Sequence, residues 1–174
     1  MGGGIRAPES HSESKEAFYV HEAGLKVVIP STPHDAKGLL VSAIDDPDPV
    51  IFLEPKKIYR SFREEVPDGT YDVPLGEAAV RREGTDVSVF TWGAMTRPTL
   101  EAAEELEGAV DVEVVDLRTL SPLDTDAIVA SFEKTGRAAV VHEAPRTGGL
   151  GAEITSIIQE EALLYQEAPV KRIT

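Results

Sequence analysis

A histidine near the amino terminus is the first side chain of the sequence that could transfer protons. His11 lies in the polar run 8–14, where serine and glutamate neighbours would keep it accessible to water. An imidazole titrates near neutral pH and can donate or accept a proton in general acid–base catalysis. A histidine in such a run is also an ordinary solvated loop residue, so the residue types alone leave both interpretations open.

An acidic turn, Asp45-Asp46-Pro47-Asp48, forms a second group of candidate side chains. Carboxylate and carbonyl oxygens on a turn that follows a helix are suitable ligands for a hard cation. A solvated acidic turn without an ion is the alternative interpretation.

A third candidate lies where an apolar strand ends in His142 and Glu143 and a glycine-rich turn, 148–151, leads into a helix. Glycines allow positive φ and close backbone approach, and open α/β sheets bind ligands at the carboxyl ends of their strands. Simple turn chemistry accounts for the same pattern.

Bulk properties exclude several classes of protein. The absence of cysteine rules out disulfides, thiolate metal sites and cysteine nucleophiles. A formal net charge of −14 argues against a nucleic-acid partner. No apolar run approaches the ~20 residues that span a bilayer, so we expect a cytoplasmic chain that does not enter a membrane. Clustered acidic residues favour a salt-adapted (halophilic) source, with an ordinary acidic surface as the alternative.

Helices and strands of two regions must position these candidates. In the first region we expect a short helix within 14–22, buried strands at 25–29 and 50–53, and a helix that starts at Thr32 as N-cap with Pro33 at its first position. Between residues 54 and 74 prolines and the Asp68-Gly69 turn interrupt any period, which predicts a linker.

The second region alternates strands and helices, which predicts βαβ units and a mainly parallel sheet covered on both faces. The strands are expected at 86–92, 111–117, 138–142 and 170–173, and the helices at 98–106, 124–134 and 152–164.

Several further polar residues are predicted to have structural roles. Asp116, Arg118 and Asp124 would end a strand, shape the turn after it and cap the following helix. We assign no chemistry to His21 or His34.

Two motifs in the second region, DLRTLSPLD (116–124) and HEAPRTGGLGAEI (142–154), resemble the C-terminal domain of the transketolase-like family. In the first region, HSESKEAFY (11–19) and GLKVVIPSTPHDAKGLL (24–40) resemble the pyrimidine-binding domain of one branch. That branch comprises the beta subunits of the thiamine-diphosphate-dependent decarboxylating component of 2-oxo acid dehydrogenase complexes, of the pyruvate or branched-chain type.

The resemblance implies an α/β fold in which the C-terminal half of a transketolase-like pyrimidine-binding domain is followed by a transketolase C-terminal-like domain with a mainly parallel sheet. The implied boundaries are 1–72 for the partial first domain with its linker and 73–174 for the second domain. Members of the family are about twice as long, so we expect a partial chain that lacks part of the first domain and the last segment of the second. Strands of the first region would then lack sheet neighbours.

The resemblance also implies roles for particular residues. His11 matches the active-site histidine that assists proton movements and acyl transfer to lipoamide. A potassium ion would be held by the carbonyls of Ala43 and Asp46 and by the side chain of Asp48, although other members often have asparagine at the last position. His142 and Glu143 would serve structure or subunit interfaces first.

The implied cofactors are thiamine diphosphate and Mg²⁺, held mainly by the missing region and by an alpha subunit. The implied partners are that alpha subunit and a second beta subunit in a heterotetramer, together with a lipoyl acyltransferase. We therefore expect this chain to be inactive alone and to contribute, when assembled, to oxidative decarboxylation of a 2-oxo acid. A non-catalytic assembly module and another transketolase-like enzyme, such as a sugar-phosphate synthase, are the alternatives.

Overall fold

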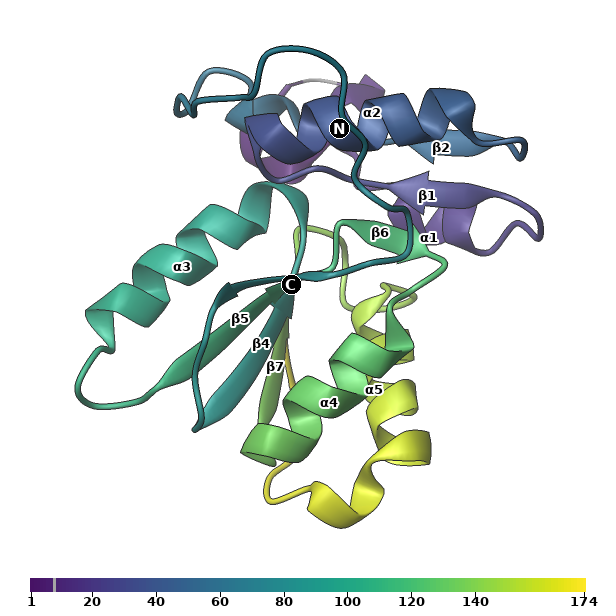
Figure 1. The fold of residues 1–174 in the computed structure, drawn as a ribbon. Helices are drawn as coiled ribbons and strands as arrows, with labels where there is room; N and C mark the ends of the chain where they lie inside the picture. The colour runs from purple at the N-terminus through teal and green to yellow at the C-terminus, as the bar shows by residue number, and fades with distance from the viewer. Residues whose placement is uncertain (8) are drawn as a thin grey trace.

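The computed structural model describes residues 1–7 and 9–174, apart from the side chains of residues 9 and 10. Two sheets with helices around them make up the fold (Figure 1). The strands are β1 Lys26–Val28, β2 Val50–Phe52, β3 Ala79–Arg82, β4 Val87–Thr91, β5 Val112–Asp116, β6 Thr119–Ser121, β7 Ala138–Val141 and β8 Lys171–Ile173. The α-helices are α1 Glu16–Val20, α2 Pro33–Asp45, α3 Thr96–Glu105, α4 Thr125–Thr135 and α5 Gly151–Glu161. Single turns of 3₁₀-helix are η1 Gly3–Ile5, η2 Glu9–Ser12, η3 Lys56–Ile58, η4 Gly93–Met95 and η5 Leu163–Tyr165.

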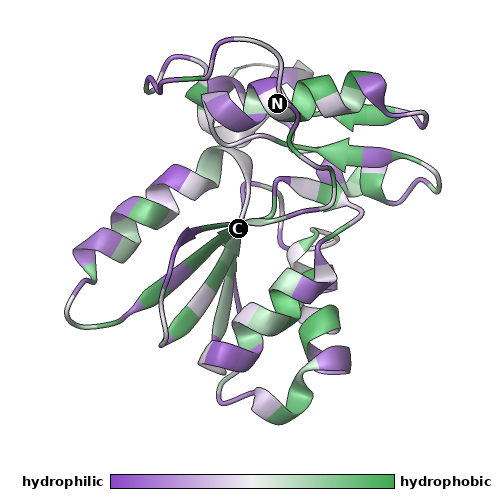
Figure 2. Cartoon of the chain, viewed as in Figure 1, coloured by the Kyte–Doolittle hydropathy of each residue, from purple (hydrophilic) through white to green (hydrophobic). Residues whose placement is uncertain are grey.

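The larger sheet has the strand order β3-β5-β4-β7-β8. Its strands run parallel except β3, which pairs antiparallel with β5. Successive side chains of β4 belong to two different hydrophobic clusters. Phe90 packs with residues of α4 and α5, whereas Val89 packs with residues of α3. Helices therefore cover both faces, as the alternation of strands and helices predicts. Figure 2 shows apolar residues along these strands, and apolar and polar residues alternating along α4 and α5.

The smaller sheet has the order β2-β1-β6 and joins the two regions of the chain. Strands β1 and β2 are parallel, and β6 pairs antiparallel with β1 through Val27 and Ser121. The expectation that strands of the first region lack neighbours is therefore wrong for β1, which is an interior strand. The sequence did not reveal β6, because a three-residue strand after a turn is too short to show a period.

One core crosses the boundary between the regions. Val27 and Ile29 of the first region are buried in the same cluster as Phe132 and Ile158 of the second. We therefore expect the two regions to stabilise each other through this shared apolar contact.

Helix ends follow the predicted capping. The Thr32 hydroxyl accepts a hydrogen bond from the Asp35 amide at 3.1 Å, with Pro33 at the first helical position of α2. Asp124 caps α4 by accepting from the Ala127 amide at 3.0 Å, and Gly136 ends that helix with φ of 65°. Two of the predicted caps are thereby confirmed.

Between residues 54 and 74 the chain forms no strand and only the short η3, as the interrupted pattern of this segment indicates. Val73, at its end, is buried against α2, where a Cβ on Gly38 would lie 2.4 Å from a Val73 methyl carbon. Strand β3, which follows, was not expected from the sequence. None of the helices in the described ranges is long and apolar enough to cross a membrane.

Candidate functional site

His11 lies in η2, in the stretch that leads from the amino terminus to α1, and its side chain is exposed to solvent. One bond anchors the start of this stretch to the body of the protein, and a second joins its two ends. The terminal amino group donates to the Glu54 carbonyl at 2.8 Å, and the Gly2 amide donates to the Glu13 carbonyl at 3.3 Å. An exposed imidazole on an anchored turn can reach a molecule that binds from outside the chain.

The acidic turn 45–48 lies at the carboxyl end of α2. Both carboxylate oxygens of Asp46 accept from the Lys26 ammonium at 2.8 Å, and a carboxylate oxygen of Asp48 lies 3.2 Å from the same ammonium. The hydrogen bond to Asp46 raises the pKa of Lys26, and the reciprocal bond lowers the pKa of Asp46. A side-chain cation of the chain itself therefore pairs with both carboxylates and offsets one of their two negative charges.

A potassium ion at this turn would have to share Asp48 with Lys26. The carbonyls of Ala43 and Asp46 lie at the helix end, where backbone oxygens lack intrahelical partners, so their chemistry fits a monovalent cation. Within the described residues, no group of three or more histidine, cysteine, aspartate or glutamate side chains could hold a metal. The described residues therefore offer no such cluster of protein ligands for Mg²⁺.

His142 is buried at the end of β7 and stacks on Trp92, with ring centroids 4.9 Å apart and planes 11° from parallel. Its Nδ1 accepts from the Ala144 amide at 3.2 Å, which places the proton of the neutral ring on Nε2. Burial, assisted by the positive charge of Arg172, lowers the pKa of His142 to about 4. At neutral pH the ring is therefore uncharged, and it packs on the Trp92 indole.

The same indole also contacts a buried carboxyl group. The Trp92 Nε1 donates to Glu16 at 3.4 Å, and burial raises the pKa of Glu16. Trp92 thus links α1, directly after the His11 segment, to the strand end that carries His142.

The other two histidines have surroundings that account for them structurally. His34 stacks on Tyr71 with centroids 4.8 Å apart, and His21 is the exposed C-cap residue of α1.

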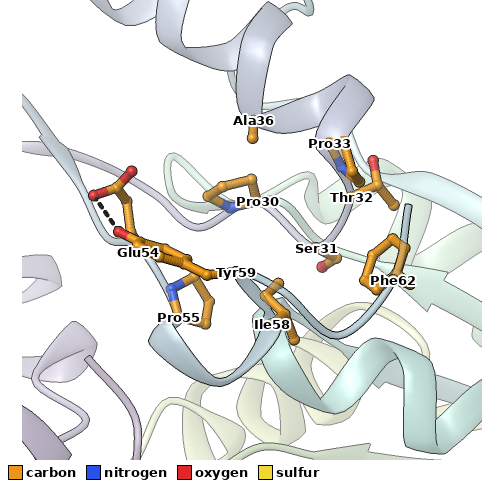
Figure 3. A pocket seen from close by; sticks show the side chains of 10 residues that line it. All are labelled: Pro30, Ser31, Thr32, Pro33, Ala36, Glu54, Pro55, Ile58, Tyr59 and Phe62. Atoms are coloured by element: carbon orange, nitrogen blue, oxygen red, sulfur yellow. Dashed lines mark hydrogen bonds between the residues drawn. The ribbon is translucent and has the colours of Figure 1, made fainter. Parts of the chain in front are cut away.

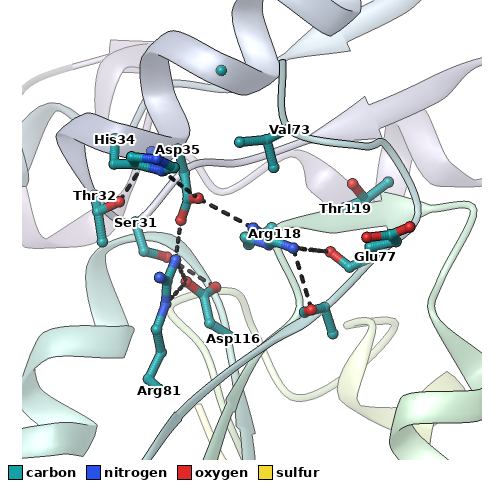
Figure 4. Close-up of polar contacts among 12 residues, drawn as sticks. Ser31, Thr32, His34, Asp35, Val73, Glu77, Arg81, Asp116, Arg118 and Thr119 are labelled. Atoms are coloured by element: carbon teal, nitrogen blue, oxygen red, sulfur yellow. Dashed lines mark hydrogen bonds and ion pairs between the residues drawn. The ribbon is translucent and has the colours of Figure 1, made fainter. Parts of the chain in front are cut away.

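A buried cluster of charges that the sequence analysis did not predict joins the two regions (Figure 4). The Arg81 guanidinium donates to the carboxylates of both Asp35 and Asp116, the latter at 3.0 and 3.1 Å. Arg118 donates to the other oxygen of Asp35 at 3.2 Å, and the Ser31 hydroxyl donates to Asp116 at 3.0 Å. Asp116 and Arg118 therefore do more than end a strand and shape a turn.

Burial dominates the electrostatics of this cluster. It raises the pKa of Asp116 to about 6, although Arg81 acts in the opposite direction. Asp35 lies in the first turn of α2 and Asp116 ends β5, so the contact depends on residues far apart in sequence. In the sequence, Asp35 and Asp116 are recognisable only as acidic residues near a helix start and a strand end, which does not predict that they meet.

A cavity of about 300 Å³ opens beside the amino-terminal end of α2 (Figure 3). Its walls include Pro30, Ile58 and Phe62, and the Tyr59 hydroxyl donates to Glu54 at its edge. Neither His11 nor the acidic turn lines it, so the cavity is separate from both candidate sites.

Comparison with known proteins gives the class of this fold. Residues 1–61 match the pyrimidine-binding domain of transketolase, and residues 76–174 match the transketolase C-terminal domain. The chain belongs to the transketolase family, and the predicted fold class is confirmed.

Two curated relatives carry the same name. The chain is 57% identical over 174 residues to the pyruvate dehydrogenase E1 component subunit beta of Bacillus subtilis strain 168. It is 53% identical to the protein of the same name from Staphylococcus aureus strain Mu50. Both matches cover 99% of this chain and 54% of the relative, so the chain spans about half the length of these relatives.

A solved structure shares the architecture. A split-gene transketolase, described as an inactive beta4 tetramer, superposes with a TM-score of 0.78 at 29% sequence identity. The match covers 98% of this chain and 53% of that chain.

Proposed function

We propose that these residues form part of the beta subunit of a thiamine-diphosphate-dependent 2-oxo acid dehydrogenase component, with pyruvate as the substrate. The observation that carries this proposal is the 57% identity to a pyruvate dehydrogenase beta subunit along 99% of the chain. The exposed, anchored His11 is consistent with it.

In the proposed assembly, an alpha subunit and a second beta subunit complete a heterotetramer in the cytoplasm, and a lipoyl acyltransferase accepts the product. Thiamine diphosphate, with Mg²⁺, would supply the carbon chemistry of decarboxylation. The described residues lack a cluster suited to Mg²⁺, so we assign its ligands to other parts of the assembly. The contribution of this chain is a proton-transferring imidazole, His11, and the frame that holds it.

The cation-binding role of the acidic turn is part of the same proposal. The carbonyls of Ala43 and Asp46 and the carboxylate of Asp48 would hold potassium, and Lys26 would move away from Asp48 when the ion binds. The existing contact between Lys26 and Asp48 is 3.2 Å, at the exposed edge of the turn, where Asp48 retains 61% of its side-chain exposure. Such a contact is weak enough to exchange with an ion from solvent.

An assembly role without catalysis is the second candidate. It is favoured by the solved neighbour, which is described as an inactive tetramer of beta chains. The two candidates differ in whether the assembled protein turns over a 2-oxo acid.

The test uses a chimera in which these 174 residues replace the matching segment of the Bacillus subtilis beta subunit. We expect the chimera, assembled with its alpha subunit and supplied with thiamine diphosphate and Mg²⁺, to decarboxylate pyruvate. We expect the 174-residue chain alone to show no turnover. Turnover by the isolated chain, or an assembled but inactive chimera, would contradict the proposal, and the second result would favour the assembly role.

A further inference from the structure

The carboxylate of Glu143 lies against the amino-terminal turn of the chain. The Gly4 amide donates to its Oε1 at 3.0 Å. A Cβ on Gly2 would lie 2.5 Å from Oε2, and a Cβ on Gly4 would lie 2.5 Å from the Lys57 Cδ and 2.8 Å from Oε1 of Glu143. The two glycines therefore let the backbone approach the carboxylate more closely than any other residue type would allow.

This contact fixes one end of the short stretch that carries His11. The stretch leaves the carboxylate at Gly4, passes through η2, and returns to Glu13, whose carbonyl accepts from the Gly2 amide. Closing a loop restricts the conformations of the residues within it. The bond between Gly2 and Glu13 and the bond from Gly4 to Glu143 together restrict where η2, which carries His11, can lie.

Glu143 is itself held by a rigid frame. It follows His142, whose ring stacks on Trp92 and whose backbone amide donates to the Ile173 carbonyl of β8 at 3.1 Å. Ala144, on its other side, is buried and donates to His142 Nδ1. The carboxylate is thus fixed at the end of the larger sheet, in the other region of the chain from His11.

We infer that Glu143 is a positioning residue for His11: its carboxylate accepts from the Gly4 amide, lies against Gly2, and thereby orders the turn that presents the imidazole. What His11 then does rests on the proposed function, whereas the ordering of the turn does not. The sequence puts Glu143 at a strand end but does not predict its partner, since the two residues of its hydrogen bond are 139 positions apart.

Deuterium uptake of the 174-residue chain tests the positioning directly. We expect Glu143→Ala and Gly4→Ala each to accelerate exchange in peptides covering residues 2–13, while peptides from β4 and β5 stay unchanged. Gly3→Ala is the matched control, because the nearest atom to its added Cβ would be the Ser12 carbonyl oxygen at 3.9 Å, an ordinary contact. Unchanged uptake in the Glu143→Ala chain would overturn the inference.

Rates of the assembled chimera test the consequence for His11. We expect Glu143→Ala to lower kcat for reductive acylation of a lipoyl domain by at least about threefold, because small displacements of a catalytic group reduce rate strongly. Glu143→Gln should restore the rate, since its amide oxygen can still accept from Gly4. Glu143→Ala should cause no further loss in the His11→Ala background, whereas a general structural defect would lower that background as well.

The outcomes separate this inference from the proposed function. A wild-type rate for His11→Ala, together with accelerated uptake in Glu143→Ala, would refute the catalytic proposal and leave the positioning intact. A reduced rate for His11→Ala, together with wild-type uptake and rate for Glu143→Ala, would overturn the positioning alone.

Discussion

The Arg81→Met substitution removes the guanidinium that lies between two buried carboxylates. Asp35 and Asp116 are 1% and 0% exposed, and Arg81 retains 23% of its side-chain exposure. Methionine keeps much of the length and apolar stem of arginine but donates no hydrogen bond. The variant therefore tests the charge contact with little change in volume.

The expected loss of stability follows from this burial. Removing one partner of a buried ion pair typically costs about 3–5 kcal/mol, because the remaining charge stays desolvated and unpaired. Arg118 still contacts Asp35 in the variant, and Ser31 still contacts Asp116, which places the expected loss near the lower limit. For a chain of this size, a loss of about 3 kcal/mol lowers Tm by roughly 6–12 °C.

The loss of stability in Arg81→Met should depend on pH, because the protonation of Asp116 depends on Arg81. Without Arg81, which lowers the pKa of this carboxyl group, the folded-state pKa rises beyond about 6. A group with a raised folded-state pKa stabilises the folded state while it is protonated, and this contribution is lost as pH rises through that pKa. The difference in unfolding free energy between wild type and variant is therefore expected to be smaller at about pH 5 than at about pH 8.

Denaturant unfolding monitored by circular dichroism at both pH values measures this difference. The control is Arg97→Met, which removes a solvent-exposed pair with Glu101 at 2.9 Å and should cost less than about 1 kcal/mol. An Arg81→Met loss no larger than that of the control, or a loss that does not change with pH, would refute the reasoning.

Three further predictions concern charge. His142 has a pKa lowered to about 4, so its contribution to stability is present above pH 6.5 and is lost as pH falls through about 4, opposite in sign to that of Asp116. Unfolding free energies should therefore be measured between about pH 4 and pH 6.5. Compared with wild type, the unfolding free energy should rise more steeply with pH in Asp116→Asn and less steeply in His142→Phe. Parallel pH profiles for the three proteins would contradict this prediction. The chain carries a net charge of −14, so its like charges repel one another, and salt at about 1 M, where the Debye length is ~3 Å, screens this repulsion. Tm should therefore rise as salt increases to about 1 M, and a constant Tm would argue against salt adaptation. At equal ionic strength KCl should raise Tm more than NaCl in wild type but not in Asp48→Ala, and equal effects in both chains would contradict a potassium site.

Local signals in the sequence predicted much of the fold. Thr32 and Asp124 cap their helices through hydrogen bonds that span three residues, so residue type and spacing suffice to identify them. Buried strands such as β4 and β5 appear as apolar runs within a regular alternation. These features depend on neighbours within one turn or one strand.

The contacts that the sequence did not reveal join distant residues. Ser31 and Asp116 are 85 positions apart, and Gly4 and Glu143 are 139 apart. The pairing of β6 with β1 likewise joins the two regions. Such contacts follow from how the sheets assemble, and residue types at either end carry no local periodicity that would predict the partner. His11 shows the same limit, since its type suggested chemistry but only the structure shows how its turn is held.

The most direct test of the proposed function is the effect of His11→Ala on acyl transfer in the assembled chimera. General acid–base groups typically contribute about 10²- to 10⁴-fold in rate, so a loss of at least about tenfold in reductive acylation of a lipoyl domain is expected. Affinity for thiamine diphosphate should change less, because its diphosphate and metal are assigned to other parts of the assembly. His21→Ala, which alters another exposed histidine, should behave as wild type. Acylation at the wild-type rate by His11→Ala would contradict the account and leave His11 an ordinary loop residue.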